Sequence, residues 1–278
     1  MLVDSHAHIQ LSQFDWDRHD VLQRAQSAGV EQILVIGFDL KTSQQAVELA
    51  INTENLWATV GMHPHDATDL TDTVMDTFRQ LADHPKVVAL GEMGLDYYRD
   101  LSPRSAQKTA FERQLDLAEE LDMPIIVHNR DAYHDILPIL RPRQGRIVGV
   151  LHSFSGDVEF MQKALDIGFY IGIGGPVTYK KSDDLQTVAK QVPANRLLIE
   201  TDCPWLAPQF RRGKRNEPSY VKSVAERIAE LRGTSIEEIG RITTQNFVAV
   251  FVAILRSTDN RMRPPRKKSG NFLLASHT

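Results

Sequence analysis

Short apolar runs alternate with amphipathic stretches along almost the whole chain, and no other feature of the sequence limits the possible folds as strongly. Eight runs have the length and composition of buried strands. They are Leu2–His8, Gln32–Gly37, Leu56–Met62, Val87–Glu92, Pro124–His128, Ile147–His152, Phe169–Gly174 and Arg196–Glu200. The helix-like segments between and after them lie at 14–28, 42–51, 70–83, 103–122, 131–140, 157–167, 182–191 and 218–232.

Strands that alternate with helices pair in parallel, and eight such units predict an α/β protein with a closed (β/α)8 barrel of the TIM type. The alternative is an open doubly wound sheet. Such a sheet normally carries a glycine-rich phosphate loop after its first strand, and this sequence has none there. In the longest helix, Ser102 is a candidate cap and Pro103 suits the first turn. Residues 235–255 are expected to form one or two closing helices at the C-terminal end of the barrel.

The barrel is expected to span residues 1–255, because the pattern stops there. Residues 256–278 carry six basic side chains and one acid, a net charge of +5, so the remainder carries −9 of the total of −4. We expect this basic tail to be disordered, as a solvated or foreign extension rather than a functional arm. A body this acidic is not a general polyanion-binding surface, so a phosphate-bearing substrate would need local positive charge or bound metal.

Composition predicts a cytoplasmic protein. Hydrophobic residues make up 42% of the chain and charged residues 24%, which is ordinary for a soluble domain. The single cysteine, Cys203, allows no internal disulfide and fits a reducing compartment. No apolar stretch approaches the roughly 20 residues of a membrane span, and the N-terminus has no signal-peptide pattern. We therefore expect no membrane association, and a monomer is favoured.

Side chains of the types that bind metals stand at the ends of five predicted strands. Two histidines alternate on the first strand, so they share one face with Cα atoms about 6–7 Å apart. The others end the fourth, fifth, sixth and eighth strands, and the carboxyl ends of barrel strands form the rim where such enzymes keep their chemistry. The full set is His6, His8, Glu92, His128, His152 and Asp202.

Four histidines, one glutamate and one aspartate are too many ligands for a single tetrahedral zinc. They suit two divalent ions that share a bridging carboxylate and activate a hydroxide between them. Mg2+, Mn2+ and Zn2+ are all candidates. The plain alternative is a set of hydrogen-bonded strand histidines. It is less favoured, because imidazoles pointing into a barrel are hard to satisfy without metal or acids.

Seven motifs occur in an order that resembles the TatD family of metal-dependent deoxyribonucleases, which are amidohydrolase-like barrels. They are DSHAH at 4–8, GMHPH at 61–65, GEMGLDYY at 91–98, PIIVHNRDA at 124–132, LHSFSG at 151–156, LIETDCPWLAP at 198–208 and RRGKRNEPSYV at 211–221. The resemblance covers roughly residues 1–251. The seventh predicted strand departs from it, ending in IGIGG rather than a more serine-rich run, and the tail after Leu255 matches nothing in the family.

The resemblance implies a 3'-5' exonuclease that trims single-stranded DNA. It implies one ion on His6, His8 and Asp202, a second on His128 and His152, and Glu92 as the bridge. An alternative is a hydrolase of another ester or an amide bond, such as an aminoacyl-tRNA deacylase, since one fold hosts both chemistries. A non-catalytic metal-binding protein is the weakest reading, because the ligand set is complete.

Four residues besides the metal ligands, together with the ligand Asp202, have further candidate roles. Asp202 combines metal binding with accepting a proton from the attacking water. His63 is placed to contact the leaving group or a phosphate oxygen, whereas the neighbouring His65 fits a shaped turn. Glu200 either orients a ligand or makes a plain buried hydrogen bond. Asp4 and Asp96 are each candidates to support a histidine, and Asp96 equally suits a loop cap.

A cationic cluster follows the eighth strand, where barrels often bind phosphate. We expect Arg211, Arg212, Lys214 and Arg215, with Lys180 from the loop after the seventh strand, to bind substrate phosphate, although a solvated charge run is the alternative. Aromatic side chains on the same loops are candidates to stack on bases, and each on its own equally suits packing. They are Tyr97, Tyr98, Phe154, Tyr179 and Trp205.

Overall fold

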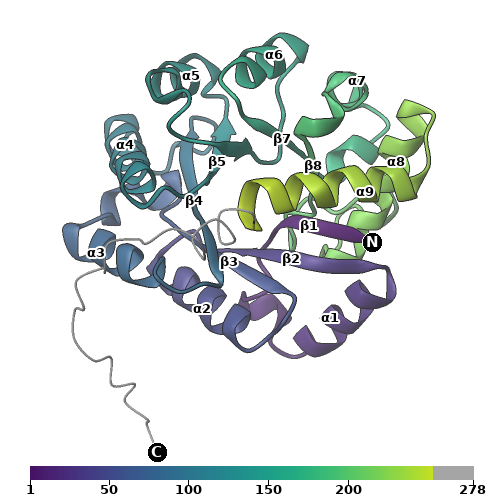
Figure 1. Cartoon of the computed structure of the whole chain (residues 1–278), viewed down its shortest axis with the longest axis horizontal. Coiled ribbons are helices and arrows are strands. Elements are labelled where there is room, and N and C mark those ends of the chain that lie inside the picture. Colours follow the sequence, from purple (N-terminus) through teal and green to yellow (C-terminus); the bar gives the residue numbers. More distant parts are fainter. Residues whose placement is uncertain (253–278) are drawn as a thin grey trace, which may run out of the picture.

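The eight expected strands all form, and they pair in parallel in chain order, from β1 to β8, in one sheet (Figure 1). The computed structural model describes residues 1–252. The strands are β1 (Leu2–Ala7), β2 (Val30–Ile36), β3 (Leu56–Val60), β4 (Val87–Asp96), β5 (Ile125–Arg130), β6 (Gly149–Leu151), β7 (Tyr170–Ile173) and β8 (Leu197–Ile199). The predicted tail at 256–278 lies outside the described residues.

Helices surround the sheet, as the alternation predicted (Figure 1). They are α1 (Arg18–Ser27), α2 (Leu40–Ile51), α3 (Asp72–Leu81), α4 (Arg104–Leu121), α5 (Tyr133–Leu140), α6 (Val158–Asp166), α7 (Asp183–Gln191), α8 (Val221–Arg232) and α9 (Ile236–Phe247). Short helical turns occur at η1 (Ser12–Phe14), η2 (Pro64–Asp69), η3 (Arg141–Arg143), η4 (Gly175–Thr178), η5 (Ala194–Arg196), η6 (Gln209–Arg211), η7 (Pro218–Tyr220) and the π-type η8 (Val248–Val252). Within residues 1–252, no helix combines the length and apolar character needed to cross a bilayer.

The sheet closes where its last strand meets its first. The amide of His8 donates to the carbonyl of Cys203 at 2.8 Å, and the amide of Asp202 donates to the carbonyl of His6 at 2.9 Å. These bonds lie just beyond β8, so they fix the segment after that strand against β1. The (β/α)8 barrel expected from the sequence is therefore present, and its closure carries Asp202 to the two N-terminal histidines.

The interior of the barrel is apolar toward the end where the strands begin. One buried cluster combines strand side chains with the last described helical segments, and α9 lies across β1 and β8 (Figure 1). The predicted closing helices thus plug one end, leaving the polar residues at the opposite end. The cluster contains Val3, Leu34, Ile36, Val88, Ala89, Ile126, Val150, Tyr170, Leu198, Phe247, Val250 and Phe251.

The expected cap of α4 was wrong. Pro103 holds the N-cap position with no capping side chain. Ser102 instead donates its hydroxyl to the carbonyl of His65 at 2.7 Å, which ties the loop before α4 to the turn after β3. The serine therefore serves a contact between two loops that are far apart in sequence.

Gly94 allows β4 to approach β5 beside a site residue. Its φ is +142°, a region that side chains rarely adopt, and a Cβ built on it would collide with the carbonyl oxygen of His128. Gly94 is also the register partner of His128 in the ladder between these strands. Strand pairing at this point therefore depends on glycine.

Candidate metal centre

The six predicted ligands meet at the carboxyl end of the barrel. His6 lies in β1 and His8 follows it, Glu92 lies in β4, and His128 lies in β5. His152 and Asp202 come just after β6 and β8. Three groups of side chains within residues 1–252 have ligand atoms within 4.8 Å of one another. They are His6 with His152 and Asp202, His6 with His8 and Glu92, and His63 with Glu92 and His128.

One carboxylate oxygen of Glu92 faces the N-terminal histidines. Glu92 Oε2 lies 3.3 Å from His6 Nε2 and 3.7 Å from His8 Nε2. Asp202 completes this side, with Oδ1 at 3.7 Å from His6 Nε2 and 3.4 Å from His8 Nε2. Two imidazole nitrogens and two carboxylate oxygens therefore converge on one small volume.

The other oxygen of Glu92 faces a second pair of histidines. Glu92 Oε1 lies 2.9 Å from His128 Nδ1 and 2.8 Å from His152 Nε2, and these two nitrogens are 3.2 Å apart. Glu92 is only 4% exposed. Its carboxylate thus stands between two groups of nitrogen donors, one on each oxygen.

The protonation of two rings can be assigned from their other partners. His8 Nδ1 lies 3.0 Å from the carbonyl oxygen of Ile36, which can only accept, so this nitrogen carries a hydrogen. In the neutral ring, His8 Nε2 then presents a lone pair to the centre. Both nitrogens of His128 face a carboxylate, with Nε2 3.1 Å from Asp96 Oδ2 and Nδ1 2.9 Å from Glu92 Oε1. A cation at the centre would replace a hydrogen on Nδ1, and the contact with Asp96 would then keep the remaining hydrogen on Nε2 and leave the Nδ1 lone pair for the ion.

This donor set fits a divalent cation. Lone pairs and carboxylate oxygens crowd together at 2.8–3.7 Å, and a buried concentration of acceptors is unfavourable unless protons or a cation hold it together. The mixture of imidazole and carboxylate ligands suits zinc, manganese and related ions. Without a cation, the histidines hold the pKa of Glu92 well below its usual range, although burial alone would raise it.

Asp96 is fixed so that it can hold His128. Its Oδ1 accepts the backbone amides of Tyr98 at 3.0 Å and Arg99 at 2.7 Å. Its Oδ2 accepts from His128 and lies 2.9 Å from His65 Nε2. Burial would raise the pKa of Asp96, but these hydrogen bonds lower it well below the usual range. Both sequence readings of Asp96, as a support for a histidine and as a loop cap, are seen here.

Glu200 lies behind His152. It is fully buried, and its Oε1 accepts the Ser153 amide at 2.5 Å and lies 3.6 Å from His152 Nδ1. A Cβ at Gly172 would collide with Glu200 Oε2, so a glycine on β7 makes room for this carboxylate. Glu200 therefore has no surface to offer a substrate, and its position suits orientation of His152.

Asp4 does not contact an imidazole ring. Its carboxylate accepts the hydroxyl of Thr201 at 2.6 Å and the backbone amides of Thr201 at 2.9 Å and His6 at 3.3 Å. Burial raises the pKa of Asp4 to about 8. Asp4 was expected to support a histidine, and it does so only by accepting the backbone amide of His6. Its shorter contacts are with Thr201, and they fix the chain next to Asp202.

His63 presents a hydrogen rather than a lone pair. It stands just before η2, and its Nδ1 accepts the amide of His65 at 3.1 Å. In the neutral ring Nε2 then carries the hydrogen, and it lies 3.5 Å from Glu92 Oε1. Burial lowers the pKa of His63 to about 4, with the charge of His128 adding to the effect. The ring is a neutral donor near pH 7, which suits contact with a substrate oxygen better than metal binding.

The cations predicted to bind phosphate contact different neighbours. Arg215 pairs with Asp17 through two hydrogen bonds, of 2.8 and 2.5 Å, so this guanidinium is already held by a carboxylate, and its role in phosphate binding stays a prediction. Arg212 lies over the Tyr179 ring at 4.5 Å, beside Lys180. Lys214 and Lys180 make no ion pair with the residues that the structure describes.

The aromatic candidates also differ from one another. Phe154 is 4% exposed and stacks on Phe160, so it packs in the core. Tyr97 donates its hydroxyl to Asp135 at 2.6 Å. Tyr98 and Trp205 are 60% and 46% exposed, and Trp205 contacts the His8 ring edge-on, with centroids 5.0 Å apart. Only these last two combine exposure with a place on the rim.

Sequence reasoning missed three residues. His65 shares Asp96 with His128, although it was read as part of a shaped turn. Arg130 lies two residues beyond His128 on β5, with its guanidinium 4.0 Å from the Tyr98 ring centre. Its position two residues after a ligand could have revealed it, since both side chains then share a strand face. Trp16 is 80% exposed, and no periodic pattern marked it.

Comparison with known proteins identifies the family. The model of the family described as TatD related DNase matches residues 3–252. The chain belongs to this family. It is 47% identical to the uncharacterized metal-dependent hydrolase YabD of Bacillus subtilis, over 90% of this chain and 99% of that protein. It is 39% identical to the 3'-5' ssDNA/RNA exonuclease TatD of Salmonella typhimurium, over 91% and 100% of the two chains.

A solved structure agrees with this assignment. The crystal structure of YJJV, a TatD homologue from Escherichia coli K12, superposes with a TM-score of 0.85 at 30% identity. The match covers 90% of this chain and 97% of that one. The protein is thus a metal-dependent hydrolase of the TatD family with a TIM-type barrel.

Proposed function

We propose that this protein is an exonuclease that trims single-stranded DNA from the 3' end with the help of two divalent metal ions. The observation that carries the proposal is the position of Glu92. Its Oε2 faces His6 and His8 while its Oε1 faces His128 and His152. A carboxylate with one oxygen facing each pair of histidines is suited to bridge two ions.

Each ion would have its own ligands besides Glu92. His6, His8 and Asp202 would hold one, and His128 and His152 the other. The contacts of Ile36 with His8 and of Asp96 with His128 support this assignment, because they aim one lone pair of each ring at the centre. Two bound ions would lower the pKa of a water molecule and polarise a phosphoryl oxygen.

The side chains around the ligands have separate tasks. Asp202 has a 13% exposed side chain, so besides binding metal it can accept the proton of the attacking water. His63 donates its Nε2 hydrogen to an oxygen of the phosphate or of the leaving group. Glu200 acts as a positioning residue through His152.

Cations on the rim would meet the substrate's charge. Arg130 follows the ligand-bearing part of β5 and makes no ion pair within residues 1–252. Arg212 and Lys180 stand on the loops after β8 and β7, at the same carboxyl end of the barrel. Tyr98 and Trp205 offer exposed rings for base stacking. Free cations next to exposed rings favour a nucleic acid over a neutral amide or ester.

The test is a cleavage assay on metal-free protein reconstituted with Mg2+, Mn2+ or Zn2+. Substrates are single-stranded and duplex DNA labelled at the 5' end, and a panel of aminoacyl esters and amides. We expect metal-dependent shortening of single strands from the 3' end, with slower attack on duplex. Glu92→Gln and Asp202→Asn should each lose at least about a hundredfold in kcat, the scale of one essential catalytic group.

Glu31→Gln is the matched control. Glu31 is an exposed carboxylate near the start of β2, at the opposite end of the barrel, and its loss should leave activity unchanged. DNA cleavage that survives in Glu92→Gln would refute the proposed centre. Turnover of an aminoacyl ester or amide but not of DNA would assign the site to the other class of substrate.

A further inference from the structure

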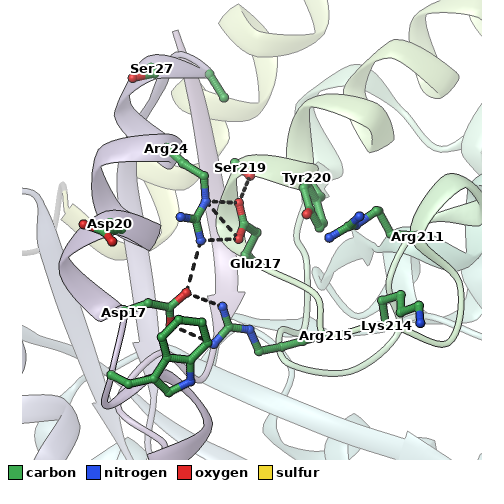
Figure 2. Close-up of a pocket in the computed structure, with 12 residues that line it drawn as sticks. Asp17, Asp20, Arg24, Ser27, Arg211, Lys214, Arg215, Glu217, Ser219 and Tyr220 are labelled. Atoms are coloured by element: carbon green, nitrogen blue, oxygen red, sulfur yellow. Dashed lines mark hydrogen bonds and ion pairs between the residues drawn. The ribbon is translucent and has the colours of Figure 1, made fainter.

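A cleft of about 890 Å³ lies between α1 and the segment that follows β8 (Figure 2). Trp16, Asp17, Asp20 and Arg24 line it from one side, and residues between Arg211 and Tyr220 line it from the other. The metal ligands are not among its lining residues. It is therefore a second concave surface on the molecule, separate from the centre described above.

Two linked ion pairs form the middle of this cleft (Figure 2). Arg24 donates to both oxygens of Glu217, at 2.7–3.2 Å, and also reaches Asp17 at 3.4 Å. Arg215 binds the same Asp17 through two hydrogen bonds. These four charges neutralise one another and join α1 to the opposite wall, so the shape of the cleft is held by the fold.

Other charges in the cleft remain unneutralised. Neither Arg211 nor Lys214 has an ion-pair partner within residues 1–252, and both lie on the same wall (Figure 2). The remaining acid, Asp20, sits on α1 and points away from these two cations (Figure 2). The wall near Arg211 and Lys214 is thus locally positive on a body whose net charge is negative.

A large aromatic ring is exposed in the same cleft. Trp16 is 80% exposed, although burying an indole would be favourable. The guanidinium of Arg215 lies 5.3 Å from the Trp16 ring centre and 4.6 Å from the Phe14 ring centre, so cation–π contacts hold the loop that carries Trp16. Within residues 1–252, the Trp16 ring makes no other ring or cation–π contact, so one face of the indole is left free.

Both walls follow strands that carry metal ligands. Residues 9–17 continue directly from β1 and His8, and residues 203–217 continue directly from β8 and Asp202. Asn216 holds the second wall to the strand end by donating to the carbonyls of Thr201 and Trp205, both at 2.7 Å. The cleft therefore starts within one loop of the centre on each side.

We propose that this cleft binds the single-stranded stretch of a polynucleotide that extends beyond the bond being cut. Trp16 stacks on a base, while Arg211 and Lys214 each neutralise a phosphate. A polynucleotide alternates bases with phosphates, which matches the Trp16 ring on one wall and the two cations, Arg211 and Lys214, on the other. A free phosphate ion would contact the cations but would leave the ring unused. The inference rests on the proposed nuclease function and names where its substrate is held.

The test measures binding without catalysis. Metal-free protein is titrated into fluorescein-labelled oligothymidylates that increase in length from the dinucleotide, and anisotropy gives the Kd. Trp16→Ala should weaken binding of long strands between about fivefold and a hundredfold, as expected for one stacked base. Trp16→Phe should restore most of it. Arg211→Ala combined with Lys214→Ala should reduce the slope of log K against log salt by about 1.4, for two phosphates.

Lys190→Ala is the matched control, because it removes one exposed, unpaired cation from the last turn of α7, away from the cleft. It should bind DNA like the wild type. An unchanged Kd for long strands in Trp16→Ala would overturn the inference, and so would equal weakening for dinucleotide and long strand. Neither result would affect the proposed function, which depends on the loss of cleavage in Glu92→Gln.

Discussion

Replacing Asp96 with asparagine should impair metal binding by His128, although the mutation leaves His128 itself unchanged. The carboxylate accepts hydrogens from His128 and His65 on Oδ2 and from two backbone amides on Oδ1. An asparagine that keeps its oxygen on the amides turns its NH2 group toward His128 Nε2. That nitrogen must then accept, so the hydrogen moves to His128 Nδ1, the atom aimed at the metal centre.

The expected loss is large enough to measure. Removing the partner of a metal-binding histidine typically weakens metal affinity by about 10- to 100-fold, which is about 1.4–2.7 kcal/mol. At a fixed excess of metal, the stabilisation by the ion falls by the same free energy. For a domain of this size each kcal/mol shifts the melting temperature by about 2–4 °C. The increase in Tm on adding metal should therefore shrink by about 3–11 °C.

Two measurements together check this expectation. Competition with a chromophoric chelator gives the metal affinities of wild type and Asp96→Asn, and calorimetry gives the melting temperature with and without Mn2+ or Zn2+. The matched control is His65→Gln, which removes the other imidazole on Asp96 and leaves the acceptor of His128 in place. The control should retain metal affinity far better than Asp96→Asn.

The reasoning would be refuted by Asp96→Asn protein that binds both metal equivalents with wild-type affinity. It would also be refuted if His65→Gln lost as much affinity as Asp96→Asn. In that case the contact of Asp96 with His128 would not be what sets the ring's lone pair.

Three further perturbations test other parts of the structure. Dialysis against EDTA should lower the melting temperature by about 5–11 °C, the effect of losing an ion present at 100 times its Kd, and adding Mn2+ should reverse it. Gly94→Ala should cost about 2–4 kcal/mol in urea unfolding, because a positive φ and a collision with the His128 carbonyl both oppose the new Cβ; wild-type stability would contradict this. Arg215→Ala should lower the free energy of unfolding by about 1–3 kcal/mol at pH 7. Arg215 lowers the pKa of Asp17 below 3.8, so the part of that loss due to the ion pair should vanish as the pH falls from 3.8 through this lowered pKa and Asp17 becomes protonated; a deficit independent of pH would exclude the ion pair as its cause.

The barrel and its main ligands could be predicted because both follow from local periodicity. Strand side chains alternate, and parallel strands bring their carboxyl ends to one rim, so His6, His8 and Glu92 had to approach one another once eight strands closed. The ligand strands were recognised for this reason, although their bounds shift by a few residues. β4, for example, continues to Asp96 instead of ending at Glu92.

The cationic cluster shows the limit of the same reasoning. Four cations in five residues look like one phosphate clamp in the sequence, yet Arg215 turns to Asp17, 198 positions earlier in the chain. Trp16 was missed because exposure is a property of the assembled surface, so no local spacing predicts it. The spacing of Arg130 from His128 places both on one strand face, but its lack of an ion-pair partner shows only in the assembled structure.

The sequence by itself determined which residues form the centre: ligand-type side chains stand at strand ends, and strand order alone brings those ends together. The tertiary structure decided what each residue does there. Only contacts between distant segments reveal that Asp96 and Ile36 fix the lone pairs of His128 and His8, and that Glu200 is too deeply buried to meet a substrate. The physical reason is that the hydrogen on an imidazole is placed by its partner across space, whereas the position of the ring follows from its own strand.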